Sequence, residues 1–175
     1  MLLWDVGAAL AISRYAFRDP AMDLRWLALG AVLPNLADKS VGSVLFWDHF
    51  RNGRIHAHTL IFAALVLAVA VVATGRGSSA RRAGVALAVG VFLHLLLDGH
   101  FTDPESFLWP FFGWQFPAEE GQRLPALLAD GSTSPLVLAL EAAGAVYLGY
   151  LWRLGGLSDP TRRARFLRDG RIRLR

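Results

Sequence analysis

The sequence contains no cysteine and a single lysine, and charged residues make up only 18% of its 175 residues. Without cysteine the chain has no disulfide framework, no thiolate nucleophile and no Cys-ligated zinc site, so any metal chemistry falls to histidine, aspartate and glutamate. Ordinary soluble domains carry about 25% charged residues. The low charge, with 54% apolar residues and a mean hydropathy of +0.39, excludes a disordered chain and predicts a protein solvated largely by the lipid bilayer.

Long apolar stretches predict the membrane helices. Thr59–Thr74 carries no charge, Ala83–Leu93 continues the same character after an Arg-rich link, and Pro135–Trp152 ends in tyrosine and tryptophan. Aromatic residues at the end of a span are typical of the headgroup region. Because a span requires about 20 residues, we expect the first two stretches to extend into the polar residues at their ends.

Two further helices are expected in the N-terminal third, at Leu2–Phe17 and Leu24–Trp47, although both contain charged residues. The second is interrupted by polar residues around Pro34, and we expect it to be broken there. A broken helix in lipid is tolerated where it lines a polar cavity inside the protein. The sequence therefore predicts an all-α, polytopic transmembrane bundle of about five spans.

The distribution of arginine predicts the orientation of this bundle. Seven of the 17 arginines lie in the last fourteen residues, and three more lie between Gly75 and Arg82. Cationic segments beside membrane spans tend to stay in the cytoplasm. We expect a transmembrane domain at residues 1–157, an Arg-rich cytoplasmic tail at 158–175, and outward-facing connections at 48–57 and 100–134, in the plasma (inner) membrane. A nucleic-acid partner is not expected, because an interleaved aromatic stacking surface is missing. The sequence does not predict the oligomeric state.

His94 and Asp98 are the first candidates for chemistry. They lie four residues apart on a predicted helix, so their side chains point the same way, one turn apart. Ionisable residues inside a membrane are costly and usually face the interior of a bundle. This pair is either half of a metal site or an ion pair that ties two helices together.

Three more polar residues approach this pair in the predicted topology. The third span begins at His56-Ala57-His58, on the membrane side where the fourth span ends. His58 is expected to point inward, whereas His56 is either a supporting residue or faces substrate. Asp38, just after Pro34, reaches the same half of the membrane. Three or four His and Asp ligands with an open position are typical of a catalytic zinc site.

An aromatic segment follows the fourth span. Residues 107–116 (FLWPFFGWQF) contain six aromatic side chains, and Pro110 and Gly113 prevent a regular helix. The segment is either a belt that anchors the bundle at the outer interface or a lid that lets a lipid headgroup reach the site. Glu105, in the turn before it, is the best-placed extra carboxylate for general-base work. A solvated turn glutamate is the alternative interpretation of Glu105.

Three motifs resemble the YdjM type of membrane-bound, predicted metal-dependent hydrolase, over roughly Leu24–Gly113. The sequence GAVLPNLAD, ending at Asp38, resembles the family's Gly-x-x-x-Pro-Asp-x-x-Asp stretch. GRIHAHTL around His58 resembles its Arg- and His-containing segment, and HLLLD followed by LWPF resembles its His-Leu-x-x-Asp and Trp-Pro-Phe signature. The family pattern is similar in outline to zinc-dependent phospholipase C, which implies a helical metal site made by Asp38, His58, His94 and Asp98. Asn35 and Ala57 depart from the pattern, because the family has aspartate at the first position and usually threonine or glycine at the second.

These observations predict a membrane-embedded, metal-dependent hydrolase with a divalent ion, zinc-like, near the outer face. Its ligands would be His58, His94, Asp98 and Asp38, with Glu105 or His56 relaying a proton, and its substrate an ester or phosphodiester of a lipid or lipid-linked molecule. The alternative is a membrane scaffold, metal carrier or transporter without turnover. An open coordination position on the ion, with a lipid-sized groove beside it, would distinguish the hydrolase from the alternative.

Overall fold

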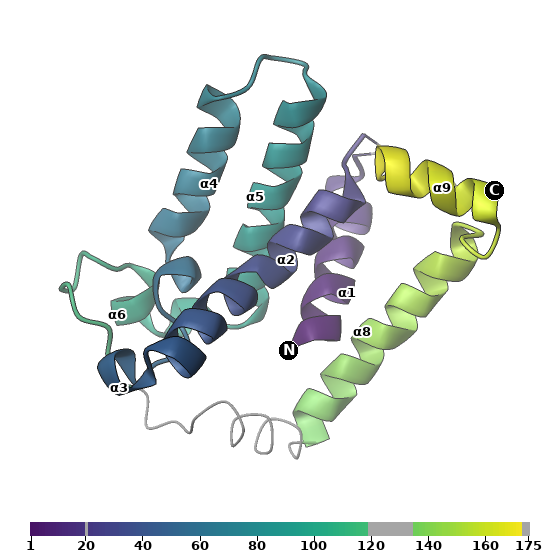
Figure 1. The fold of residues 1–175 in the computed structure, drawn as a ribbon. Helices are drawn as coiled ribbons and strands as arrows, with labels where there is room; N and C mark the ends of the chain where they lie inside the picture. Colours follow the sequence, from purple (N-terminus) through teal and green to yellow (C-terminus); the bar gives the residue numbers. More distant parts are fainter. Residues whose placement is uncertain (20, 119–134, 173–175) are drawn as a thin grey trace.

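The computed structural model describes residues 1–19, 21–118 and 135–172. Within these ranges the chain is helical and has no strand, which confirms the all-α prediction. The longer helices, shown in Figure 1, are α1 (Leu2–Ile12), α2 (Leu24–Asp38), α4 (Leu60–Val72), α5 (Ser79–Leu97) and α8 (Pro135–Leu154). The shorter helices α3 (Trp47–Phe50) and α6 (Pro104–Phe107) lie near the end of α2, and α9 (Pro160–Asp169) follows α8.

The second helix is not broken at Pro34, so that expectation is wrong. Helix α2 runs through Pro34 to Asp38 and then continues as a π-helical segment, Lys39–Leu45. A proline inside a helix removes one backbone donor and crowds the carbonyl four residues earlier. Pro34 is fully buried, and α5 packs closely along α2. Tertiary packing therefore overrides the helix-breaking tendency, and the winding changes only after Asp38.

Glycines let the helices that carry the candidate site approach closely. A Cβ atom at Gly30 of α2 would lie 2.1 Å from the Leu87 carbonyl oxygen of α5, and one at Gly90 of α5 would lie 2.2 Å from the Leu27 carbonyl oxygen. Only glycine fits at this crossing. Small residues at helix crossings are typical of membrane bundles, where close backbone contact replaces the hydrophobic effect.

Both helices of the α4–α5 hairpin begin at a residue whose side chain caps the helix N-terminus. The Thr59 hydroxyl accepts from the Phe62 N–H at the start of α4, and the Ser78 hydroxyl accepts from the Arg81 N–H at the start of α5. The Arg81 guanidinium donates to the carbonyls of Val71 and Thr74, which satisfies acceptors that the end of a helix leaves open. Helix α5 begins at Ser79, so part of the predicted Arg-rich link belongs to its first turn.

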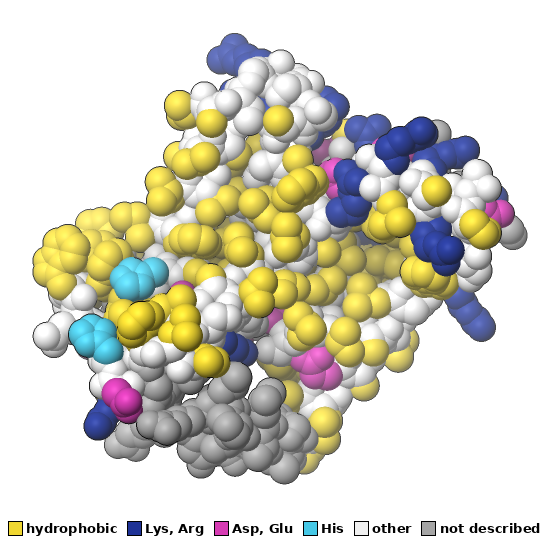
Figure 2. Space-filling view, in the orientation of Figure 1, with side chains coloured by type: hydrophobic (Ala, Val, Ile, Leu, Met, Phe, Trp, Pro, Cys, Tyr) yellow, Lys and Arg dark blue, Asp and Glu magenta, His cyan; other side chains and the backbone are white. Residues whose placement is uncertain are grey.

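Within the described residues, two helices, α5 and α8, are long and apolar enough to cross a membrane by length and composition, and α4 is a shorter apolar helix. The five predicted spans are therefore not confirmed. Large apolar side chains are exposed along α4, including Leu65, Val69 and Val72. Figure 2 shows apolar side chains across the middle of the visible face, with lysine and arginine gathered mainly toward the top and the right. The Arg-bearing α4–α5 link and α9 lie in that half of the molecule (Figure 1).

The C-terminal segment folds back onto the start of α2. Asp159 caps α9 by accepting from the N–H groups of Thr161 and Arg162. The Leu24 N–H then donates to the Gly170 carbonyl at 2.9 Å, and Ile172 packs against the core formed by α1, α2, α5 and α8. The Arg-rich segment is thus docked against the bundle as far as residue 172.

Candidate metal centre

Three side chains meet where α4 begins and α5 ends. His58, His94 and Asp98 each offer one ligand atom, and these atoms lie within 4.8 Å of one another. His58 lies in a 3-10 turn just before α4, His94 in the last turn of α5, and Asp98 caps that helix. Both histidines are fully buried, whereas the Asp98 side chain is 8% exposed. The group therefore opens toward the surface on the Asp98 side.

Asp38 stands behind His58 rather than inside this group of three. One carboxylate oxygen of Asp38 accepts from His58 Nδ1 at 2.7 Å and from the backbone N–H groups of Ile55 and His58, and the other accepts from the Ala57 N–H. These four bonds fasten the turn before α4 to the end of α2. They also fix the His58 ring so that its Nε2 atom points at His94, which is the arrangement that metal-ligating histidines usually have.

Asp5 lies beside the other ring nitrogen of His94 at ion-pair distance. The Oδ2 atom of Asp5 lies 3.4 Å from His94 Nδ1, which makes no hydrogen bond to the described residues, and accepts from the Asn35 amide at 3.3 Å. Asp5 is fully buried in α1. Asn35, which departs from the family motif, therefore donates to a buried carboxylate, a bond that an ionised aspartate at this position could not make.

The two histidine rings face each other through their Nε2 atoms, 3.3 Å apart. Where each Nδ1 carries its proton toward its carboxylate, both Nε2 atoms present lone pairs to the space between the rings. Two facing lone pairs repel, and a cation between them removes the repulsion. Two imidazoles and one carboxylate also match the three protein ligands of catalytic zinc sites of the two-histidine, one-carboxylate kind. The residues present fit a divalent ion.

Arg54 sits beside the partly exposed member of the group. Its Nε atom lies 2.8 Å from Asp98 Oδ2, and its side chain is 41% exposed. The guanidinium thus brings a fixed positive charge to the side on which the group approaches the surface. A cation at this position favours an anionic molecule over a neutral one.

His100 is a further buried histidine next to the group. Its ring centroid lies 5.6 Å from that of His58, and its Nε2 atom has no hydrogen-bond partner among the described residues. Burial, with a smaller contribution from His58 and Arg54, lowers the pKa of His100 to about 4. The ring is therefore neutral near pH 7 and offers a lone pair or an N–H group to a polar molecule at the site.

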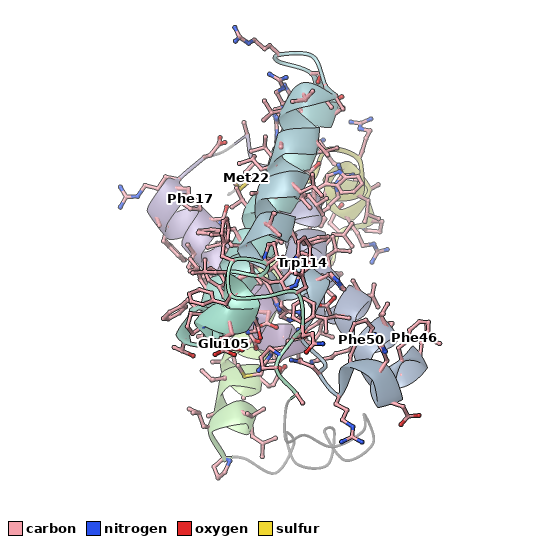
Figure 3. The ribbon with its side chains drawn as sticks, turned by 90° about the vertical axis from the view of Figure 1, so that its left-hand side faces the viewer. Phe17, Met22, Phe46, Phe50, Glu105 and Trp114 are labelled. Atoms are coloured by element: carbon pink, nitrogen blue, oxygen red, sulfur yellow. The ribbon has the colours of Figure 1, made fainter. Side chains whose placement is uncertain are left out.

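Two predicted site residues lie outside this group. His56 is exposed, with its ring centroid 5.3 Å from that of Trp109 and 4.9 Å from that of Phe116. Glu105 is exposed on α6, at the side of the molecule seen in Figure 3. The structure thus brings together His58, His94 and Asp98, places Asp38 in direct contact with His58, and packs the His56 ring against Trp109 and Phe116 of the aromatic segment.

Sequence reasoning missed Asp5, Arg54 and His100 as site residues. Asp5 carried a signal, because an aspartate in an apolar helix marks a functional site by default. His100 lies in the turn after the His94–Asp98 pair. Gly99, with φ of +69°, bends the chain there and places His100 against His58, a geometry that residue spacing does not reveal.

The fold and the group define a helical membrane protein with a candidate metal centre at one end of its bundle. The family model described as YdjM inner membrane protein matches residues 5–156. The chain therefore belongs to the YdjM inner membrane protein family, as the sequence motifs indicated, and a lipid bilayer is its expected environment. No curated protein and no solved structure matches the chain.

Proposed function

We propose that this chain is a metal-dependent hydrolase that cleaves a phosphodiester of a lipid or lipid-linked substrate. The observation that carries the proposal is the pair of facing Nε2 atoms of His58 and His94, 3.3 Å apart, with Asp98 completing the group. An ion held by these residues would supply Lewis-acid activation of water and stabilise the charge that develops during hydrolysis. Zinc is the ion that this donor set suits best.

The chain's own residues have separate tasks in this proposal. Asp38 holds the His58 imidazole by a hydrogen bond, and Asp5 faces the His94 imidazole at ion-pair distance, so both rings have a carboxylate that favours the orientation the ligands require. Arg54, next to Asp98, positions an anionic phosphate by a charge-assisted hydrogen bond. This cation is the reason to favour a phosphodiester over a carboxyl ester.

His100 is a further polar group beside the ligands that the sequence did not indicate. It is neutral, buried and close to His58, so its ring can donate or accept a hydrogen bond to a molecule at the site. His56 instead contributes, with Trp109 and Phe116, to an aromatic wall at the surface. We assign that wall to the lipid part of the substrate, which fits the lid interpretation of residues 107–116.

The test is turnover of matched substrates by the purified, zinc-loaded protein. Phosphatidylglycerol and a diacyl carboxyl ester without phosphate would be supplied in mixed micelles, with and without a chelator. We expect chelator-sensitive release of product from the phosphodiester, and loss of most of the rate in His94→Ala, because that ligand cannot be replaced locally. His49→Ala, which changes an exposed histidine on α3, is the matched control and should behave as wild type. A broader panel of lipid phosphodiesters extends the test to other headgroups.

Equal rates for wild type and His94→Ala on every substrate would contradict the proposal. If zinc binds at the site and yet no member of the panel is cleaved, the protein is a metal-binding scaffold or carrier. Cleavage of the carboxyl ester alone would overturn the role given to Arg54.

A further inference from the structure

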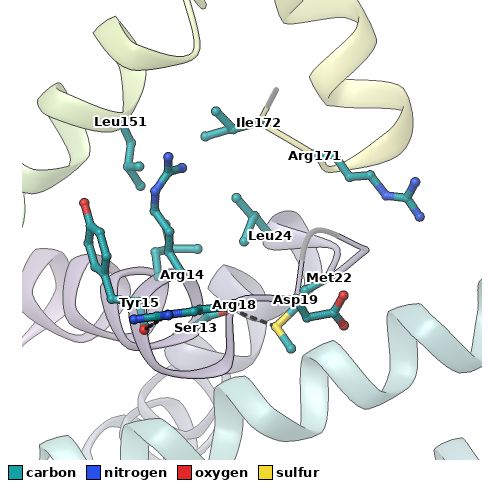
Figure 4. Close-up of a pocket in the computed structure, with 11 residues that line it drawn as sticks. Ser13, Arg14, Tyr15, Arg18, Asp19, Met22, Leu24, Leu151, Arg171 and Ile172 are labelled. Carbon is teal, nitrogen blue, oxygen red and sulfur yellow. Dashed lines mark hydrogen bonds between the residues drawn. The ribbon is translucent and has the colours of Figure 1, made fainter. Parts of the chain in front are cut away.

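A recess lies away from the candidate metal centre, where the end of α1, the α1–α2 link, α8 and the C-terminal segment meet (Figure 4). Its volume is about 660 Å³, within the range of sites that bind small molecules. Ser13, at its edge, lies eight residues after Asp5, which corresponds to about 12 Å along a helix. The recess is therefore separate from the group around His58.

The lining of this recess has one apolar side and one cationic side. Leu24, Leu151 and Ile172 provide apolar wall, and Arg14, Arg18 and Arg171 provide positive charge against a single carboxylate, that of Asp19. Figure 4 shows Arg14 reaching into the space between Tyr15 and Leu24. An amphiphile with a negative headgroup has the matching distribution of charge and apolar surface.

No described carboxylate pairs with the arginines of this recess. Among the residues that the structure describes, none of the three forms an ion pair, and the Asp19 carboxylate is engaged by the Ala21 N–H at 2.7 Å. The Nε atom of Arg171 is buried and has no hydrogen-bond partner in the described part of the chain. A buried N–H group of a cation without an acceptor is costly, so this edge of the recess has a donor that none of the described residues satisfies. One guanidinium group can bind a phosphate through two parallel N–H···O hydrogen bonds.

The location of the recess indicates where such a phosphate comes from. The recess lies in the Arg-rich half of the molecule, beside the docked C-terminal segment, and the chain belongs to an inner membrane family. The side chains of Tyr15 and Tyr147 meet edge to face, with ring centroids 6.4 Å apart, beside Arg14. Tyrosine and arginine together at a helix end are typical of the headgroup layer.

We propose that this recess binds the headgroup of an anionic phospholipid, with the phosphate at the Arg14 guanidinium and the glycerol and first acyl carbons against Leu24 and Leu151. The site serves as a lipid anchor at the Arg-rich end of the bundle. It does not depend on the hydrolase activity proposed above, since it uses none of the metal-centre residues.

The test measures lipid binding by thermal stabilisation of the full chain in a neutral detergent. The probes are short-chain phosphatidylglycerol, phosphatidylcholine with the same acyl chains, and inorganic phosphate. We expect phosphatidylglycerol to raise the melting temperature in a saturable manner, and the other two to have little effect at the same concentrations. Arg14→Gln should weaken the apparent Kd at least about tenfold, the effect of one lost charge-assisted bond, and Arg171→Gln should weaken it in the same direction through the loss of a positive charge at the edge of the recess.

Arg76→Gln is the matched control, because it removes an exposed arginine from the α4–α5 link in the same half of the molecule. It should bind phosphatidylglycerol as wild type does. Arg18→Gln is a further variant in case one of the others fails to fold, as judged by circular dichroism. Equal stabilisation by phosphatidylcholine, equal stabilisation by phosphate alone, or unchanged binding in folded recess variants would each overturn the proposal. A loss in Arg76→Gln as large as in Arg14→Gln would show only a diffuse charge effect and would overturn it as well.

Discussion

His58 and His94 face each other through their Nε2 atoms at 3.3 Å, and each presents its opposite ring nitrogen to a buried carboxylate. Asp38 contacts His58 from the end of α2, and Asp5 contacts His94 from α1. The two ligands thus come from the α4–α5 hairpin, while the residues that orient them come from the N-terminal helices. Packing of α1 and α2 against α5 is therefore a condition for the site as well as for the fold.

The first prediction concerns the orienting carboxylates. Asp38→Asn and Asp5→Asn should each lower the affinity for zinc by about 10- to 100-fold, because the rings lose the partner that fixes their orientation. Competition with a chromogenic chelator measures this affinity. Glu105→Gln changes an exposed carboxylate on α6 and should leave the affinity unchanged. Equal affinities in all four proteins would show that the carboxylates do not support the site.

The second prediction concerns the crossing of α2 and α5. Gly90→Ala should destabilise the protein by about 1–3 kcal/mol, since the new methyl group would overlap backbone atoms of α2. Gly149→Ala is the control on α8, where an added Cβ atom meets nothing within 4 Å. That change should be neutral or stabilising by about 0.5–1 kcal/mol through helix propensity. Unfolding in detergent compares them, and equal stability of the two variants would argue against the close crossing.

The third prediction is the orientation in the membrane. The native chain has no thiol, so a thiol reagent labels only the cysteine that is introduced. Ser79→Cys, at the start of α5, should resist an impermeant reagent added outside, whereas Thr102→Cys, near the metal centre, should be labelled. Both positions are exposed. Outside labelling of Ser79→Cys with protection of Thr102→Cys would reverse the orientation.

The sequence predicts the apolar helices well. The predicted runs Thr59–Thr74 and Ala83–Leu93 overlap α4 (Leu60–Val72) and α5 (Ser79–Leu97). The spacing of His94 and Asp98 also predicts the shared face on which they meet. In these cases local chemistry alone determines the outcome.

Other features depend on contacts between distant segments. Pro34 was expected to break its helix, but packing between α2 and α5 keeps it intact. The pairing of Asp5 with His94 arises only when α1 packs against the bundle, and the position of His100 follows from the turn at Gly99. The role of Asp38 as a support for His58 likewise becomes visible only from its four hydrogen bonds.

The most direct test of this account is the metal content of the purified protein after exposure to zinc and removal of free ions. Wild type and His49→Ala should each retain about one ion per chain, the stoichiometry of a single three-ligand site. His58→Ala and His94→Ala should retain almost none while their helix content, measured by circular dichroism, stays the same. Retention of one ion per chain by both folded ligand variants, or by none of the four proteins, would contradict a metal centre at His58, His94 and Asp98.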